Sequence, residues 1–514
     1  MIKKAYSLII GIALSFSAYS QFIELPLLYS LRSEFFHQAA LNGDSVYMDY
    51  APIYSDELSS TEGFPHLICD TISDRNWLGR KFFNENLIIL NKKNIYLTLD
   101  PIFNFSTGVD LSDSLSTTLY TNTRGIKIEG VLGKNILFST SFLENQAHFP
   151  NYVNTFIESN GVVPGMGRVK DYKNKDYDYA IAMASISWKV SDFLRIKFGN
   201  DKDFLGFGYR SILLTDNAFS YPHLKLDFYF AKQKLKYTLN YALLQDLIRL
   251  PKGETPESLF ERKVGAFHYL SYLPNRKFSI GLFSGTILPN TAVDSVNNFY
   301  LDALNPILMM NPLLNNPNYI NKIGLNLSLE IWKNTRFYFQ FAENPSNWDQ
   351  YSLLAGFRTW DLLIPGLNLT LEYTSSKEES AAVLNEGKTK SYSHYSQSLA
   401  HVLGSGFNEI FAQIDYRYKH IYFLLSLNYA ERNVLDGQFW GFIDQDVQIA
   451  ENEDLMASSL LINAELSYLF NSKTNMELAL GYRVKRSGMD SIFGKTDYLY
   501  LAFRTSLFNQ YVDF

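Results

Sequence analysis

The chain has 514 residues, a formal net charge of -6 and a single cysteine, Cys69. This acidic balance gives no basic footprint for nucleic acid, and one cysteine excludes an internal disulfide framework. Aromatic residues make up 16% of the chain, with 35 Tyr and 39 Phe, which is in line with the aromatic girdles of outer-membrane barrels.

The first residues have the pattern of a secretory signal. Lys3 and Lys4 precede an apolar run over residues 5–16, and the small-residue pattern Ala18-Tyr19-Ser20 follows. A transmembrane anchor is the alternative, but the run is well short of the roughly twenty residues that span a bilayer. We predict a signal peptide over residues 1–20, a mature N-terminus at Gln21, and export.

Residues 21–80 alternate poorly and form a separate N-terminal segment in our interpretation, helical or periplasmic. We expect helix from Leu25 to Ala40, and a second helix in a later loop, where Thr255 caps and Pro256 takes the first helical position. Residues 81–514 are predicted to form one barrel domain.

Strands with sorted faces recur along that domain. Leu224, Leu226 and Phe228 alternate with Lys225 and Asp227. Successive strand side chains point to opposite faces, so each strand is apolar toward one medium and polar toward another. Further segments with this pattern are residues 235–241, 325–331, 367–373, 410–417 and 476–484. A soluble sandwich gives the same alternation, and the signal peptide favours a membrane barrel.

Residues 497–514 end the chain with the same alternation. Leu501 and Phe503 fall on the face that we assign to lipid, and Arg504 and Ser506 fall on the lumen face. The chain then stops on an aromatic residue, Phe514.

These patterns predict an all-β fold, a large antiparallel transmembrane barrel with small N-terminal or periplasmic helical elements. No segment after the signal has eighteen uninterrupted apolar residues, so a bilayer span requires a barrel. The length allows about fourteen to eighteen strands.

A search for chemistry finds no zinc-protease, phosphate-loop, paired-cysteine or nucleophile-elbow motif, and no histidines at metal-ligand spacing. We therefore expect no enzyme activity, metal or cofactor. Asp201 and Asp203 would share one side of a strand, which permits a shared site, but we favour a solvated turn, since most acidic side chains are exposed.

Several long motifs resemble one family of proteins. They are the stretch from Arg80 to Phe105, the segments beginning at Thr123 and at Val162, and above all FGNDKDFLGFGYRSILLTDNAFSYPHLKL from Phe198 to Leu226, followed in order by motifs at 268–288, 301–307, 353–374 and 394–418. They resemble the Wzi-like capsule-assembly barrels of Gram-negative bacteria, most of all the RemB gliding-motility branch of the Bacteroidota. The N-terminal sixty mature residues match poorly.

The resemblance implies an outer-membrane barrel of about eighteen strands, without catalysis. It implies association with surface polysaccharide in the capsule branch and cell-surface gliding in the RemB branch. The expected partners are outer-membrane lipid together with a surface polysaccharide or proteins of the gliding or secretion machinery.

The candidate residues for binding a glycan or partner lie in the strongest motif: Asp201, Asp203, Tyr209, Arg210, Asp216 and Asn217. Aromatic faces and planar hydrogen-bonding groups suit a sugar. A purely architectural role, with these residues filling the lumen, is the competing interpretation. A porin-like diffusion or uptake channel is the alternative function.

Overall fold

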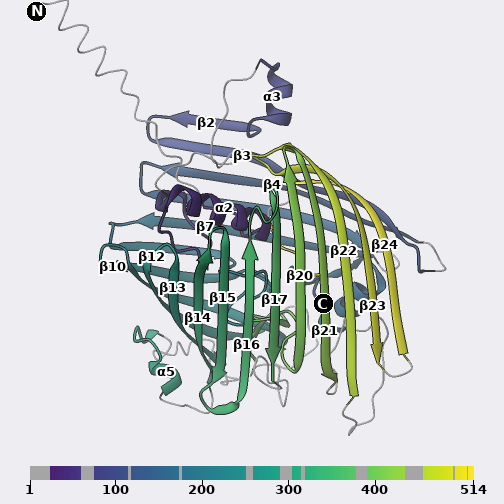
Figure 1. Ribbon diagram of the computed structural model, residues 1–514. Coiled ribbons are helices and arrows are strands. Elements are labelled where there is room, and N and C mark those ends of the chain that lie inside the picture. Colours follow the sequence, from purple (N-terminus) through teal and green to yellow (C-terminus); the bar gives the residue numbers. More distant parts are fainter. Residues whose placement is uncertain are drawn as a thin grey trace, which may run out of the picture.

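The computed structural model describes residues 24–58, 74–113, 117–172, 176–250, 259–289, 304–313, 319–377, 391–434, 455–489, 492–505 and 508–514. Within these ranges, 18 antiparallel strands close into one barrel (Figure 1). The predicted fold class is confirmed. The predicted signal peptide, the helix at Thr255 and Pro256, and Ser506 lie outside the described residues.

The barrel closes where its last strand pairs with its first, with Phe503 of β24 opposite Phe105 of β3. The barrel strands in chain order are β3 (Ile95–Asp110), β4 (Thr118–Leu132), β5 (Ile136–His148), β7 (Asp176–Lys189), β8 (Leu194–Asp201), β10 (Tyr221–Phe230), β11 (Leu235–Leu250), β12 (Leu259–Asn275), β13 (Phe278–Pro289), β14 (Ile320–Trp332), β15 (Thr335–Asn344), β16 (Asn347–Thr359), β17 (Leu367–Ser376), β20 (Phe407–Tyr418), β21 (Ile421–Val434), β22 (Leu455–Asn471), β23 (Met476–Met489) and β24 (Ile492–Thr505).

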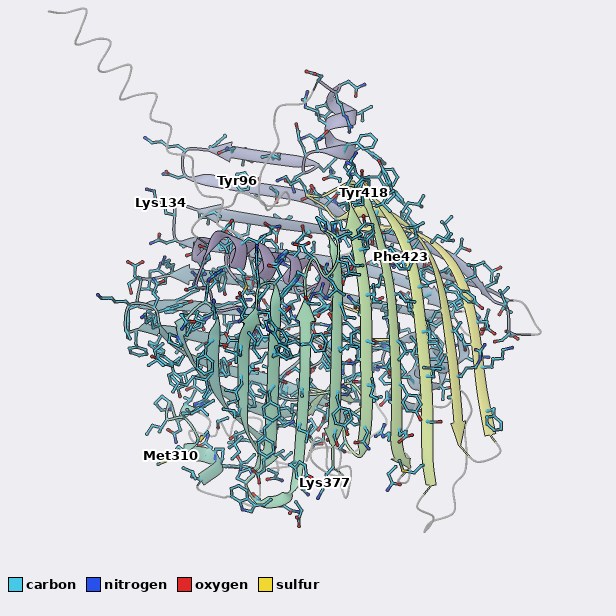
Figure 2. All side chains as sticks on the ribbon, viewed as in Figure 1. Tyr96, Lys134, Met310, Lys377, Tyr418 and Phe423 are labelled. Carbon is cyan, nitrogen blue, oxygen red and sulfur yellow. The ribbon has the colours of Figure 1, made fainter. Side chains whose placement is uncertain are left out.

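The wall is polar inside and apolar outside. Lys197 and Lys225 are 0% and 1% exposed, whereas Phe198, which follows Lys197 on the same strand and points to the other face, is 66% exposed. Figure 2 labels Tyr418 and Phe423, two aromatic residues of the outer face, 55% and 37% exposed. A soluble sandwich would bury its apolar face in a core, so this distribution decides for a barrel in lipid.

The two ends of the barrel differ in their connections. At one end, short turns join the strands, for example residues 133–135, 231–234, 333–334 and 419–420. The connections at the other end include the long segments 149–175, 202–220 and 377–406. Among the described helices, none has the length and apolar content to cross a membrane.

The N-terminal helix lies inside the barrel (Figure 1). Helix α2 (Tyr29–Asn42) confirms the helix expected from Leu25, with a later start. Pro26 disfavours helix at Leu25, the residue before it, and the helix begins three residues after this proline. The helix ends at Gly43, whose φ of 82° is the left-handed conformation that glycine adopts readily.

The remaining elements are short and pack around the barrel or within it. They are β1 (Tyr50–Ala51), the 3-10 helix η1 (Ser55–Glu57), α3 (Trp77–Phe83), β2 (Ile88–Lys92), α4 (Asn151–Asn160), β6 (Lys170–Tyr172), β9 (Phe204–Leu205), α5 (Met310–Leu313), β18 (Ser393–His394) and β19 (Gln397–Ser398). β1 pairs with β9, which joins the N-terminal segment to the connection between β8 and β10.

The final residues do not continue the last strand. β24 ends at Thr505, and Phe514 is 3% exposed in an apolar cluster with Tyr152 and Ile157 of α4. The aromatic C-terminus thus packs within the protein, and does not end the strand ladder.

Candidate functional site

Most of the predicted site residues lie in the connection between β8 and β10, residues 202–220. This connection is almost entirely buried. Its β9 pairs with the N-terminal segment, and its Leu205 also bridges to Leu214. The strongest sequence motif is therefore an internal filling of the barrel.

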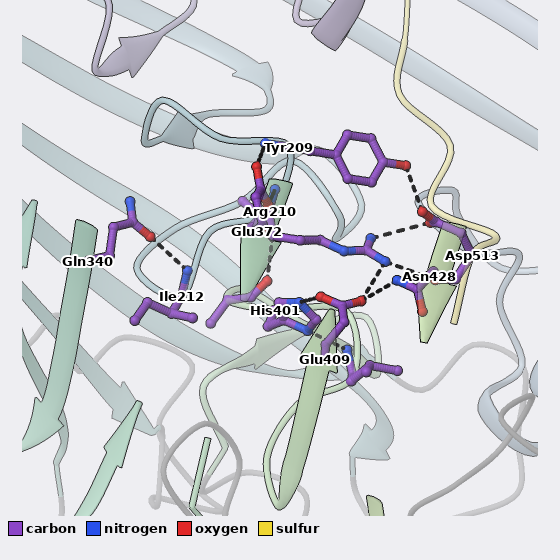
Figure 3. Close-up of polar contacts among 12 residues, drawn as sticks. Tyr209, Arg210, Ile212, Gln340, Glu372, His401, Glu409, Asn428 and Asp513 are labelled. Carbon is purple, nitrogen blue, oxygen red and sulfur yellow. Dashed lines mark hydrogen bonds and ion pairs between the residues drawn. The ribbon is translucent and has the colours of Figure 1, made fainter. Parts of the chain in front are cut away.

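Arg210 is the centre of a buried polar network (Figure 3). Its guanidinium forms an ion pair with Glu409 at 3.0 Å and donates to the main-chain oxygen of Asp513 at 2.8 Å. Glu409 also lies 2.7 Å from His401 Nε2 and accepts from Asn428. Arg210 thus joins the connection, the barrel wall and the C-terminal tail, as the architectural interpretation expects.

Glu372 of β17 fixes the main chain of the same motif (Figure 3). Its two carboxylate oxygens accept the N–H groups of Tyr209 and Arg210 at 2.6 and 3.1 Å. The Tyr338 hydroxyl donates to the same carboxylate at 2.7 Å. A carboxylate that accepts three hydrogen bonds is well satisfied, so its role is to position the Tyr209 backbone.

Tyr209 is half-buried, and its ring packs against two other aromatic rings. It stacks on Phe411 with ring centroids 4.4 Å apart and meets Tyr29 edge to face at 5.3 Å. Its hydroxyl donates to Asp513 at 2.9 Å. Of the six predicted residues, Tyr209 lines the main cavity of the lumen.

Asp216 and Asn217 hold chain segments together. Asp216 accepts hydrogen bonds from Asn509 and from the Tyr511 hydroxyl, both at 2.8 Å. The amide of Asn217 donates to the main chain of Ser398 at 3.3 Å. The two residues are 3% and 5% exposed, so their side chains make contacts within the protein and are largely inaccessible to solvent.

Asp201 and Asp203 do not form a shared carboxylate site. Asp203 is fully buried and accepts from Lys225 at 2.6 Å and from Asn240 at 2.7 Å. Asp201 pairs with Lys197 instead and lines a different, smaller cavity. The solvated turn that we favoured is wrong, because both carboxylates form ion pairs with buried lysines inside the barrel.

The dry surroundings of this network shift its ionisable groups. Burial lowers the pKa of Lys202 to about 8, with Asp216 opposing the shift. Burial also raises the pKa of the Asp513 carboxyl, against the effect of Arg210. Burial lowers the pKa of His401, against the effect of Glu409.

A polar cavity of about 290 Å³ lies beside Tyr209, between α2, the C-terminal tail and the wall. Its lining reaches the short-turn end of the barrel at Leu469, Asn475 and Thr505. The volume is near the lower limit for small-molecule pockets. Its polar wall residues are Asn104, Thr123, Asn145, Gln413, Arg417, Tyr422, Ser426, Asn463, Glu465, Ser467, Glu477, Arg483, Tyr500 and Arg504.

The charges of the cavity are partly paired. Arg504 forms ion pairs with Glu465 and Glu477, the second at 2.8 Å. Arg417 lies 3.6 Å from Glu34 of α2. Together with amides, hydroxyls and tyrosine rings, this lining suits a hydroxyl-rich molecule more than an apolar one.

The wall residues of the cavity were not among the predicted site residues. Glu477 and Arg483 were placed on the polar face of their strand, and the structure confirms that face. The sequence does not reveal that these two residues share a cavity with Tyr209, because this proximity depends on how the barrel closes. Within the described part of the chain, no cluster of three or more His, Cys, Asp or Glu side chains is arranged to hold a metal ion.

Comparisons with known proteins give fold relatives. No protein-family model and no curated protein matches the chain. Among solved structures, it is similar to Wzi, an outer membrane protein involved in group 1 capsule assembly in Escherichia coli and a carbohydrate-binding β-barrel. The TM-score is 0.56 at 10% identity, over 95% of this chain and 100% of that chain.

Two outer-membrane proteins of Pseudomonas aeruginosa match less well. OpdK has a TM-score of 0.44 at 10% identity, over 79% of this chain and 98% of its own, and OprD has 0.41 at 10% identity, over 79% and 94%. At such identities the likeness concerns the fold. The wall, polar inside and apolar outside, and the shared fold with Wzi together make this chain an outer-membrane β-barrel.

Proposed function

We propose that the protein is a non-enzymatic outer-membrane barrel that associates with surface polysaccharide and acts in cell-surface gliding. The observation that carries this proposal is the filled lumen. The N-terminal segment, the 202–220 connection and the C-terminal tail meet there and leave a polar, aromatic-lined cavity. Such a lining matches the chemistry of a sugar, which has hydroxyl edges and flat C–H faces.

Two further observations support the polysaccharide part. The chain shares its fold with Wzi over nearly all of both chains, and Wzi is described as a carbohydrate-binding barrel. The motif from Phe198 to Leu226, which resembles the Wzi and RemB barrels, contributes Tyr209 to the cavity. The gliding part rests on the resemblance of the motifs to the RemB branch.

We propose different roles for the six predicted residues. Tyr209 contacts the glycan, whereas Asp203, Arg210, Asp216 and Asn217 hold the surrounding segments in place. Asp201 supports the wall near its own cavity.

Replacing Tyr209 with alanine should reduce surface glycan and spreading, because the aromatic wall of the cavity is lost. Cells that carry the variant would be compared with a gene deletion and with Tyr373→Ala, a change at an outward tyrosine that is 43% exposed. The measurements are surface glycan, colony spreading and heat-dependent migration of the barrel on gels. Normal glycan and spreading in the deletion strain would refute the proposed function.

The alternative function is a porin-like channel. The polar cavity is compatible with a channel, because charged side chains also line the lumens of conducting barrels. Ion current through purified protein separates the two functions.

A further inference from the structure

Several polar atoms around the cavity are buried without a hydrogen-bond partner among the described residues. They include Oδ1 of Asn463 and Oγ of Ser467. These residues are 9% and 2% exposed, and both belong to the cavity lining. A buried polar atom without a partner costs about 1 to 3 kcal/mol, so this wall is built for a partner that brings hydroxyl groups or water.

Arg483 lies next to these atoms and differs from the other arginines of the cavity. It is directly opposite Asn463 in the pairing of β22 with β23. Arg504 and Arg417 each have a carboxylate within ion-pair distance. Among the described residues, no carboxylate lies within ion-pair distance of Arg483.

The hydrogen bonding of Arg483 leaves one edge of its guanidinium open. Nη1 donates to the Tyr152 hydroxyl at 3.2 Å, and Nε is buried without a partner in the part of the chain that the structure describes. The edge formed by Nε and Nη2 is one that binds carboxylates with two parallel hydrogen bonds. An anionic group is therefore the partner that this edge fits.

The neighbouring lining gives the ligand its other features. Tyr422 and Tyr500 lie in the same wall, and Asn104 adds a second amide with a buried, unpartnered oxygen in the described region. The volume of about 290 Å³ suits one or two sugar rings rather than a polymer segment.

We propose that this cavity binds one acidic sugar unit, with its carboxylate on Arg483 and its hydroxyls on Asn463 and Ser467. This inference rests on the proposed function and specifies the ligand of the same cavity as a uronic acid. At the short-turn end of the barrel, Asn475 and Thr505 complete the lining.

The test compares galacturonate with galactose, because galacturonate carries a carboxylate where galactose has a hydroxymethyl group. Purified full-length protein in detergent would be titrated with each sugar at low salt by calorimetry. We expect galacturonate to bind about tenfold more tightly than galactose, because a charge-assisted pair replaces a neutral contact. Equal affinities would overturn the proposal.

Two variants assign the preference to this wall. Arg483→Gln should remove it, whereas Arg486→Gln, on the outward face of the same strand and paired with Asp497, should retain it. Asn463→Asp keeps Arg483 but places a carboxylate opposite it, and should also abolish the preference. If Arg483→Gln fails to assemble, Asn463→Asp alone decides.

The outcomes separate this inference from the proposed function. A galacturonate preference that survives both variants contradicts the site. Equal binding of the two sugars, with surface glycan lost in the deletion strain, refutes the acidic ligand and leaves the proposed function standing. Normal glycan and spreading in the deletion strain refute the proposed function itself.

Discussion

Replacing Arg210 with alanine should lower the free energy of unfolding by about 3 to 5 kcal/mol, the cost of leaving a buried charge without its partner. Arg210 and Glu409 are 2% and 1% exposed in their side chains, so water cannot replace the lost guanidinium. The side chain also holds Asp513 of the C-terminal tail. Urea unfolding of the barrel in lipid vesicles measures the loss.

Arg417→Ala is the matched control for this experiment. Its ion pair with Glu34 has both side chains 28% exposed, and partly exposed pairs contribute roughly 0 to 1 kcal/mol. A loss at Arg210 as small as that at Arg417 would mean that the network does not hold the lumen filling together. A normal barrel with reduced glycan retention would instead favour a direct binding role for Arg210.

Replacing Leu501 with arginine should cost about 2 to 4 kcal/mol if this residue lies at the bilayer midplane. Leu501 is 46% exposed on the outer face of β24, opposite Leu480, which is 51% exposed. A guanidinium at this position would be transferred from water into the hydrocarbon of the bilayer, which is unfavourable. Unfolding in vesicles again gives the free energy.

Leu501→Ala serves as the control, because it shortens the side chain without adding charge. We expect the arginine variant to lose much more stability than the alanine variant. Equal losses would reject the assignment of this face to lipid.

The wall of the barrel was predictable because its signal is local. Lys225 and Asp227 alternate with Leu224 and Leu226, and the structure places the first pair inside and the second outside. The period of two fixes the faces once the surrounding medium is known. The predicted signal peptide and the absence of long apolar segments indicated a membrane barrel, and the resemblance favoured eighteen strands within the range that length allowed.

The filling of the lumen was not predictable in this way. The main-chain N–H of Tyr29 donates to Asn509, 480 residues away, and Asn509 also binds Asp216. The N-terminal segment has no strand period that would place it, and the alternation that we followed to Phe514 does not reveal that the strand ends at Thr505. Pro26 accounts for the extended backbone at Leu25, but the position of α2 inside the barrel depends on contacts with residues far away in the sequence.

The candidate site was predictable in part. Tyr209 lines the cavity, whereas Arg210 and Asp216 serve the internal network, in agreement with the architectural interpretation. Arg483 and Asn463 were missed because a polar residue on a lumen face is common in every strand of such a barrel. The three-dimensional structure of the closed barrel is needed to identify which of these polar atoms lack a hydrogen-bond partner among the described residues.

Single-channel recording in planar bilayers tests the central claim, a filled lumen with a binding cavity, most directly. The account predicts that purified protein inserts and stays without steady ion current, and that excess galacturonate changes nothing in this record. A steady, protein-dependent current, reduced by galacturonate, would contradict the account and make the protein a channel.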